Sequence, residues 1–194
     1  MNDTPAPAHD APPADYPVEL ERVWQASDGT PVTLRALRPD DLDRELDFIA
    51  GLSVETLHLR LQYASRGVSR EEAARLLHLD YRDTLAVAAL AQDDAGERIV
   101  GVSRYARVPN TDRAECAIVV ADGWQGRGLG TELMRSLGAA ARSRGIRSLE
   151  GTSLGENKRI LDWAQRFGFT IRTEPNSGGL MQVTLDLESF PPAS

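Results

Sequence analysis

The length, composition and charge of the chain exclude several classes of protein. Its 194 residues suffice for one α/β domain with a sizeable core, and no apolar run approaches the length of a bilayer span. The net charge of −7 disfavours nucleic acid as a partner, because such partners usually demand basic patches. The single cysteine, Cys116, cannot form an internal disulfide and lacks the companions that a zinc site needs. We therefore expect no metal site, no nucleic-acid partner and no membrane partner.

The first residues predict a tail instead of a folded segment. Residues 1–16 are rich in Pro, Ala and Asp and hold almost nothing to bury, so we expect them to be disordered. They also lack the basic and apolar regions of a secretory signal, which makes a cytoplasmic location the default expectation. We expect residues 17–190 to form a single domain.

The first half of this domain is predicted to start with a hairpin and to continue as helices. Two extended stretches between residues 18 and 37 flank the turn signal Ser27-Asp28-Gly29. A helix is expected to start at Pro39, and a second to cover residues 54–61. Ser69 and Glu72 form a capping-box pattern, which predicts a third helix ending near residue 78.

The second half is predicted to be a strand meander followed by alternating strands and helices. Alternating or continuous apolar residues predict the strands, and the periodic apolar stripe of residues 128–144 predicts a long helix. The expected strands are 84–91, 99–108, 113–121, 146–152, 167–173 and one ending near residue 187, with helices at 128–144 and 156–166. This order predicts an α/β fold.

A glycine-rich segment between a predicted strand and a long helix is the most informative part of the chain. The N-terminus of a helix offers unpaired backbone N–H groups and a partial positive charge, and glycines let a phosphate approach the backbone. A Walker loop is excluded because Gly130 is followed by Thr131 and Glu132 instead of Lys-Ser/Thr. A dinucleotide fingerprint is excluded because Gly126, Gly128 and Gly130 are each two residues apart. The alternative to a binding loop is a tight turn, but one glycine would suffice for that.

The segment from Gln125 to Gly130 resembles the Q/R-x-x-G-x-G/A motif of the GNAT family of N-acetyltransferases. This resemblance implies a GNAT fold, in which a mixed, mostly antiparallel sheet of about six or seven strands is flanked by helices. It also implies acetyl-CoA as co-substrate, with its pyrophosphate held by the loop amides. The loop residues assigned to this role are Gln125, Gly126, Arg127, Gly128, Leu129, Gly130 and Thr131.

Further family-like segments flank the loop. Asn157 and the pair Gly168-Phe169 are similar to the second coenzyme-contacting region of the family, although Asn157 could equally be a simple helix cap. In the family, the strand that ends here at Val120 splays from the strand that ends near Thr152, and the gap admits the pantetheine arm. The resemblance assigns the arm to the backbone of Ile118, Val119 and Val120.

Glu115 is the candidate general base. A lysine ammonium with a pKa of about 10.4 costs roughly 4 to 5 kcal/mol to deprotonate at neutral pH, so acyl transfer to an amine needs a positioned base. Glu115 lies in an otherwise apolar strand, and we expect that setting to desolvate its carboxylate. The alternative is a glutamate at a sheet edge that is exposed to water. Strand alternation should point Cys116 away from Glu115, which argues against a cysteine nucleophile.

Three segments are similar to the acetyltransferase domain of bacterial protein lysine acetyltransferases that act on acyl-CoA synthetases. These segments are 114–120, 53–60 with the pattern S-x-E-T-x-x-x-R, and 78–81. The resemblance implies a protein lysine as acceptor, on an acyl-CoA synthetase or another protein, and places the catalytic glutamate at Glu115. Ala164 stands where many GNAT members carry a tyrosine acid, which this branch also lacks.

Three functions stay open at this point. The first is a protein lysine acetyltransferase, the second is a small-molecule amine acetyltransferase on the same fold, and the third is a non-catalytic acyl-CoA-binding regulatory module. A monomer and a homodimer are both compatible with the sequence.

Overall fold

The computed structural model describes residues 13–61, 68–93, 96–173 and 178–190. Most of the predicted tail, residues 1–12, lies outside the described residues. Tyr16, which we expected in the tail, is buried: it donates a hydrogen bond from its hydroxyl to the Ala36 carbonyl at 3.1 Å and packs edge-on against Tyr81. The division into a tail and one domain of residues 17–190 stays a prediction, and the burial of Tyr16 shows that packed structure begins before residue 17.

The centre of the fold is an eight-stranded sheet in the order β1-β2-β3-β4-β5-β6-β8-β7. All neighbouring strands are antiparallel except β5 and β6, which are parallel. This confirms the expected mixed, mostly antiparallel α/β sheet, with eight strands in place of six or seven. The strands are β1 (Arg22–Gln25), β2 (Pro31–Ala36), β3 (Thr84–Asp93), β4 (Gly96–Arg107), β5 (Arg113–Val120), β6 (Ser148–Leu154), β7 (Thr170–Thr173) and β8 (Leu180–Asp186).

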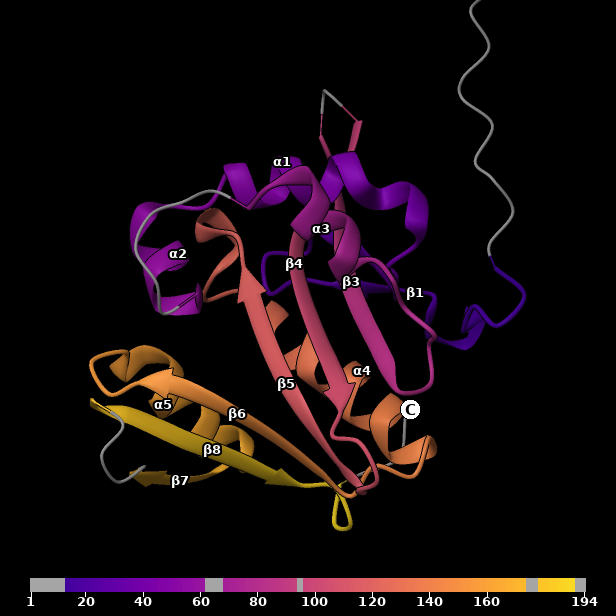
Figure 1. Cartoon of the computed structure of the whole chain (residues 1–194). Coiled ribbons are helices and arrows are strands. Elements are labelled where there is room, and N and C mark those ends of the chain that lie inside the picture. Colours follow the sequence, from indigo (N-terminus) through magenta and orange to yellow (C-terminus); the bar gives the residue numbers. More distant parts are fainter. Residues whose placement is uncertain (1–12, 62–67, 94–95, 174–177, 191–194) are drawn as a thin grey trace, which may run out of the picture.

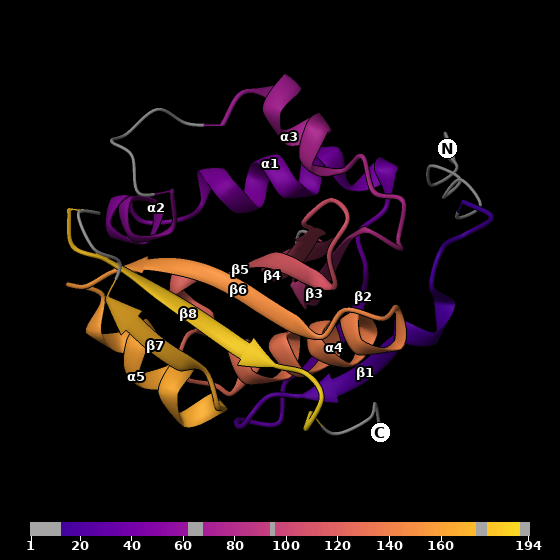
Figure 2. The ribbon, with the colours of Figure 1, turned by 60° about the horizontal axis from the view of Figure 1, so that its bottom comes forward.

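Helices cover both faces of the sheet, as Figures 1 and 2 show. Three helices of the N-terminal half lie on one face, and the two later helices lie on the other. They begin and end close to the predicted bounds, and Ser69 and Glu72 form the expected capping box. The helices are α1 (Leu42–Ala50), α2 (Val54–Leu61), α3 (Arg70–Leu76), α4 (Leu129–Ser143) and α5 (Lys158–Phe167).

The sheet separates two hydrophobic clusters because successive strand residues point to opposite faces. On β3, Leu85 and Val87 belong to the cluster under α4, whereas Ala86 and Ala88 belong to the cluster under α1 and α3. β3 is therefore buried on both sides, which explains why its sequence is a continuous apolar run instead of an alternating one.

The parallel pair β5 and β6 stays together for only three residue pairs. Arg113, Ala114 and Glu115 of β5 face Ser148, Leu149 and Glu150 of β6, and no later pair follows. Figure 1 shows the two strands starting side by side and then diverging. Beyond Glu115, β5 continues to pair with β4 while β6 continues to pair with β8. The predicted splay between these strands is confirmed.

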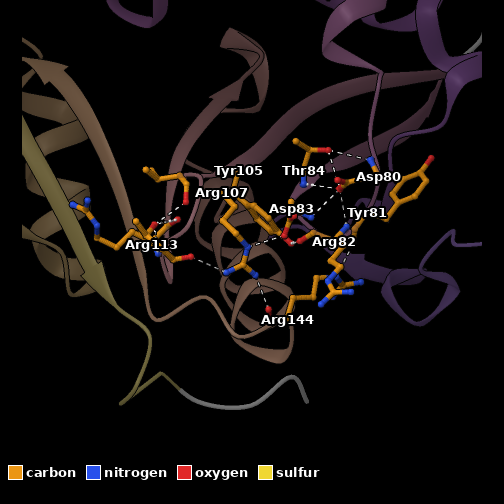
Figure 3. A network of polar contacts seen from close by, with 11 residues as sticks. Asp80, Tyr81, Arg82, Asp83, Thr84, Tyr105, Arg107, Arg113 and Arg144 are labelled. Atoms are coloured by element: carbon orange, nitrogen blue, oxygen red, sulfur yellow. Dashed lines mark hydrogen bonds and ion pairs between the residues drawn. The ribbon is translucent and has the colours of Figure 1, made fainter.

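The end of the sheet where β5 and β6 meet is held by a polar network (Figure 3). The Arg107 guanidinium donates to the Asp83 carboxylate and to the Arg144 carbonyl, each at 2.7 Å. Arg144 in turn donates to the Tyr81 carbonyl at 2.7 Å, and the Asp80 carboxylate accepts from the Thr84 backbone N–H at 2.7 Å. These two arginines therefore connect the turn before β3 with the end of β4 and the end of α4.

A buried ion pair ties the start of the helical layer to the sheet. The Arg35 guanidinium on β2 contacts both carboxylate oxygens of Asp41 at 2.6 and 2.7 Å, and Asp41 has no exposed surface. Burial alone would raise the pKa of Asp41, but the hydrogen bonds and charge of Arg35 outweigh it and hold this pKa below its ordinary value. Asp41 also accepts the Arg38 backbone N–H at 2.8 Å, which fixes the entry to α1.

We predict that Asp41→Asn lowers the free energy of unfolding by about 3 to 5 kcal/mol at pH 7, because it leaves the Arg35 charge buried without its partner. A carboxyl with a lowered pKa stabilises the fold above its unfolded pKa of about 3.9 and loses that contribution as pH falls through the folded value. The difference between wild type and variant should therefore shrink below about pH 4. Urea unfolding across a pH series measures both effects.

Asp43→Asn is the matched control for this prediction. Asp43 pairs with Arg70 at 2.7 Å, but both side chains are largely exposed, so its loss should change stability little. Equal effects of the two substitutions would contradict a special role of the buried pair.

Candidate functional site

A large cleft opens where β5 and β6 part. Its volume is about 1470 Å³, larger than most small-molecule pockets, and it is lined by β5, β6, the glycine loop and the helices α2 and α5. The cleft runs through the sheet because the two strands are no longer hydrogen-bonded to each other after they part. It therefore connects the α4 and α5 side of the sheet with the α2 side.

The glycine loop joins the end of β5 to the start of α4 at one wall of this cleft. Gly126 and Gly128 have φ angles of +80° and +85°, which L side chains rarely adopt, so both positions need glycine for their conformation. Gly128 is the N-cap of α4, and no side chain caps this end. The first backbone N–H groups of a 15-residue helix thus lie beside the cleft without a side-chain acceptor. Two left-handed glycines exceed what a simple turn requires.

The predicted loop residues divide into two groups. Gln125, Gly126, Gly128, Gly130 and Thr131 line the cleft. The other two have side chains that are used elsewhere and do not line it, so they could meet a ligand only through their backbone. These are Arg127, which pairs with Asp28 at 2.7 Å and lies over the Trp124 ring, and Leu129, which is buried in the core.

Ile118, Val119 and Val120 all line the cleft. Their side chains alternate, because Ile118 and Val120 pack towards α4 whereas Val119 packs towards the other face. Their register partners lie on β4 alone. The side of β5 that faces β6 is therefore open to the cleft along these residues.

Glu115 stands at the last paired position before the strands part. It lies opposite Ala106 on β4 and opposite Glu150 on β6, and it lines the cleft. The side chain is exposed, so our expectation that apolar neighbours would desolvate it is wrong. Some of these neighbours point to the opposite face of the strand, and the others border the open cleft. Cys116 packs on the α4 side, away from Glu115, as alternation predicts.

A second carboxylate lies next to Glu115. Residues that oppose each other in a sheet share a face, so Glu150 projects to the same side as Glu115. Arg113, two residues before Glu115, contacts the Glu150 carboxylate at 3.2 Å. Both carboxylates line the cleft, but Glu150 is engaged in an ion pair and is less exposed than Glu115. Sequence reasoning did not single out Glu150.

Asp122 connects the loop region to α2 and was also missed from the sequence. Its carboxylate accepts hydrogen bonds from the Ser53 backbone and hydroxyl, both at 2.9 Å, and from the Thr56 hydroxyl at 2.7 Å. The Ser53 backbone N–H and then the Thr56 hydroxyl lower the pKa of Asp122. The family-like pattern at residues 53–56 was a signal, because these two side chains anchor α2 to the segment after β5.

Helix α5 forms the opposite wall. Asn157 lines the cleft, but its side-chain oxygen accepts the Ile160 backbone N–H at 3.2 Å, so it serves as the helix cap that we considered as an alternative. Ala164 is buried at the same wall. Trp163 donates to the Thr131 hydroxyl at 3.1 Å, which fixes α5 against the start of α4.

The family-like pair Asp80-Tyr81 lies in the polar network of Figure 3 and does not line the cleft. Asp80 organises a turn by accepting backbone N–H groups of Arg82, Asp83 and Thr84. Tyr81 has a φ angle of 58° and donates its hydroxyl hydrogen to the Leu37 carbonyl. This pair is therefore a structural feature, separate from the site.

None of the described helices combines the length and apolar character needed to cross a membrane. Within the same residues, no group of three or more His, Cys, Asp or Glu side chains is placed to hold a metal ion.

Comparison with known sequences identifies the family. Residues 52–169 match the model of the acetyltransferase (GNAT) family. An acetyltransferase of Pseudomonas aeruginosa is 35% identical over 79% of this chain and 83% of its own length. The acetyltransferase Pat of Mycolicibacterium smegmatis is 31% identical over 70% of this chain, which spans only 40% of that longer protein.

Solved structures agree with this result. The GNAT domain of the S. lividans protein PAT superposes with a TM-score of 0.80 at 27% identity, covering 88% of this chain and 99% of that domain. A Salmonella typhimurium protein solved with its cofactor acetyl-CoA has the same fold, with a TM-score of 0.65 at 17% identity over 84% of this chain and 98% of its own. The chain belongs to the acetyltransferase (GNAT) family and is an acetyl-CoA-dependent N-acetyltransferase.

Proposed function

We propose that this enzyme transfers the acetyl group of acetyl-CoA to a lysine amine of another protein, with Glu115 as general base. The observation that carries the proposal is the position of Glu115. It lies where β5 and β6 part, in the same cleft as the glycine loop and the start of α4. One continuous cleft can therefore hold the donor at the loop and present the thioester near the carboxylate.

The residues of the cleft suit a donor of this shape. The unpaired N–H groups and the partial positive charge at the start of α4 favour the diphosphate, and the left-handed glycines keep side chains away from it. The open side of β5 from Ile118 to Val120 offers backbone groups to the amides of the pantetheine arm. The arm is then directed through the sheet towards Glu115.

Glu115 would remove the proton that keeps a lysine amine unreactive. The neutral nitrogen attacks the thioester carbonyl carbon, the C–N bond forms and the C–S bond breaks. The nitrogen loses its second proton to solvent as the amide forms, and the departing thiolate takes up one proton. Because Ala164 cannot supply that proton, a water molecule is the donor in this proposal. The exposure of Glu115 suits a base that must reach a large acceptor and release its proton to solvent.

A protein acceptor is favoured by the similarity to PAT and Pat and by the family-like α2 segment at the cleft. The branch resemblance suggests an acyl-CoA synthetase as the first acceptor to examine. Small-molecule amines are the alternative acceptors.

We predict that Glu115→Gln lowers the rate of acetyl transfer by about 10² to 10⁴, which is the usual contribution of a general base. The affinity for coenzyme A should stay unchanged, because Glu115 lies at the acceptor end of the cleft. The initial rate of thiol release, measured with an acceptor that the wild type acetylates, tests the first statement. Calorimetric titration with coenzyme A tests the second.

Glu150→Gln is the control that separates the two neighbouring carboxylates. Because Arg113 already binds Glu150, this substitution should reduce the rate much less than Glu115→Gln. A larger loss for Glu150→Gln would make Glu150 the base and overturn the assignment of Glu115.

We further predict that Gly126→Ala weakens coenzyme A binding by about tenfold, equivalent to roughly 1.4 kcal/mol. The added methyl group would need a left-handed conformation and would point into the cleft, where Arg159 is its nearest neighbour at 4.0 Å. Gly145→Ala is matched, since Gly145 has a φ angle of +78° and open space around it but lies at the other end of α4. It should reduce stability without changing the affinity; a loss of affinity in both variants would contradict a binding role of the loop.

A further inference from the structure

Arg159 reaches across the cleft from α5 to the glycine loop. One guanidinium nitrogen donates to the Gln125 side-chain oxygen at 2.5 Å. The other terminal nitrogen is the atom nearest to the position that a Cβ on Gly126 would occupy, at 4.0 Å. The guanidinium therefore lies over the loop at Gly126, on the side where a larger residue would carry its side chain.

Both ends of this contact are held by the fold. The Gln125 amide donates to the Val120 carbonyl at 3.0 Å, so its oxygen is directed away from β5. On α5, Arg159 and Trp163 are four residues apart and share a helix face, and Trp163 is fixed to the Thr131 hydroxyl at 3.1 Å. The start of α5 is therefore oriented so that Arg159 faces the loop and the start of α4.

The partner of Arg159 differs from the partners of two other arginines near the cleft. Arg104 is paired with the Glu45 carboxylate at 2.5 Å, and Arg127 with Asp28 at 2.7 Å. Among the described residues, Arg159 forms no ion pair, and its hydrogen-bond partner is a neutral amide. A carboxylate would compete strongly with an anionic ligand for the guanidinium, whereas an amide oxygen competes weakly. Arg159 can thus exchange its partner for a phosphate at little cost.

We propose that Arg159 binds a phosphate group of coenzyme A, exchanging the Gln125 oxygen for phosphate oxygens. The phosphate would then lie between the N–H groups of the loop on one wall and the guanidinium fork on the other. This inference rests on the proposed binding of coenzyme A in the cleft and adds a phosphate-specific contact from α5. The contact links occupation of the loop to the position of α5.

Titration of the whole protein with three ligands tests the proposal. Coenzyme A carries a diphosphate and a 3′-phosphate, 3′-dephospho-coenzyme A carries the diphosphate alone, and pantetheine carries neither. Arg159→Gln should weaken coenzyme A binding by about tenfold, in line with the loss of charge-assisted hydrogen bonds, and leave pantetheine binding unchanged. If the diphosphate is the partner, binding of the dephospho form weakens equally; if the 3′-phosphate is the partner, only the complete coenzyme is affected.

Two further variants control for charge and geometry. Arg135→Gln removes the same charge from an exposed position on α4 outside the cleft lining and should leave all three affinities unchanged. Arg159→Lys keeps the charge but loses the planar fork, so it should recover part of the affinity. Thermal unfolding of each variant verifies that the fold is retained.

The outcomes separate this inference from the proposed function. If the wild type bound neither coenzyme A nor pantetheine, that result would contradict coenzyme binding itself. Wild-type binding with unchanged coenzyme A affinity in Arg159→Gln would overturn only the role of Arg159. An equal loss of coenzyme A and pantetheine binding in that variant would show that Arg159 supports the shape of the cleft, which also overturns the phosphate contact.

Discussion

The early separation of β5 and β6 is the constraint on which the rest of the site depends. Three residue pairs hold the strands together, and Glu115 and Glu150 form the last of them. Gly151 follows at the point of separation, where a Cβ would lie only 3.1 Å from the Cys116 carbonyl oxygen. A larger residue there would push the strands apart sooner. The cleft, the open side of β5 and the position of Glu115 all follow from this geometry.

Three polar connections then hold the walls of the cleft in place. Asp122 anchors α2 to the segment after β5, Trp163 anchors α5 to α4, and Arg159 spans the cleft to Gln125. Each of them joins residues that are at least 32 positions apart in the chain. The donor loop and the acceptor side are thus parts of one connected structure, and a ligand that displaces Gln125 from Arg159 would act on α5 directly.

Local patterns predicted the elements, whereas long-range partners could not be read from the sequence. The apolar periodicity of α4 and the capping box at Ser69 are local and helped to predict the order of elements. The strand splay was implied by the family resemblance alone. The exposure of Glu115 depends on where β6 leaves β5, which no pattern within β5 records. The roles of Asp122 and Arg159 likewise depend on contacts made across the fold, and Tyr16 is buried against Tyr81 and Ala36, which lie far from it in the sequence.

Release of coenzyme A thiol from acetyl-CoA, with an acyl-CoA synthetase and a panel of small amines offered in parallel, tests whether the acceptor is a protein lysine. We predict turnover with the synthetase that depends on Glu115, and none with the small amines. Turnover with a small amine alone would contradict the protein acceptor and make this a small-molecule acetyltransferase. Binding of acetyl-CoA without turnover on any acceptor would contradict the catalytic role assigned to Glu115.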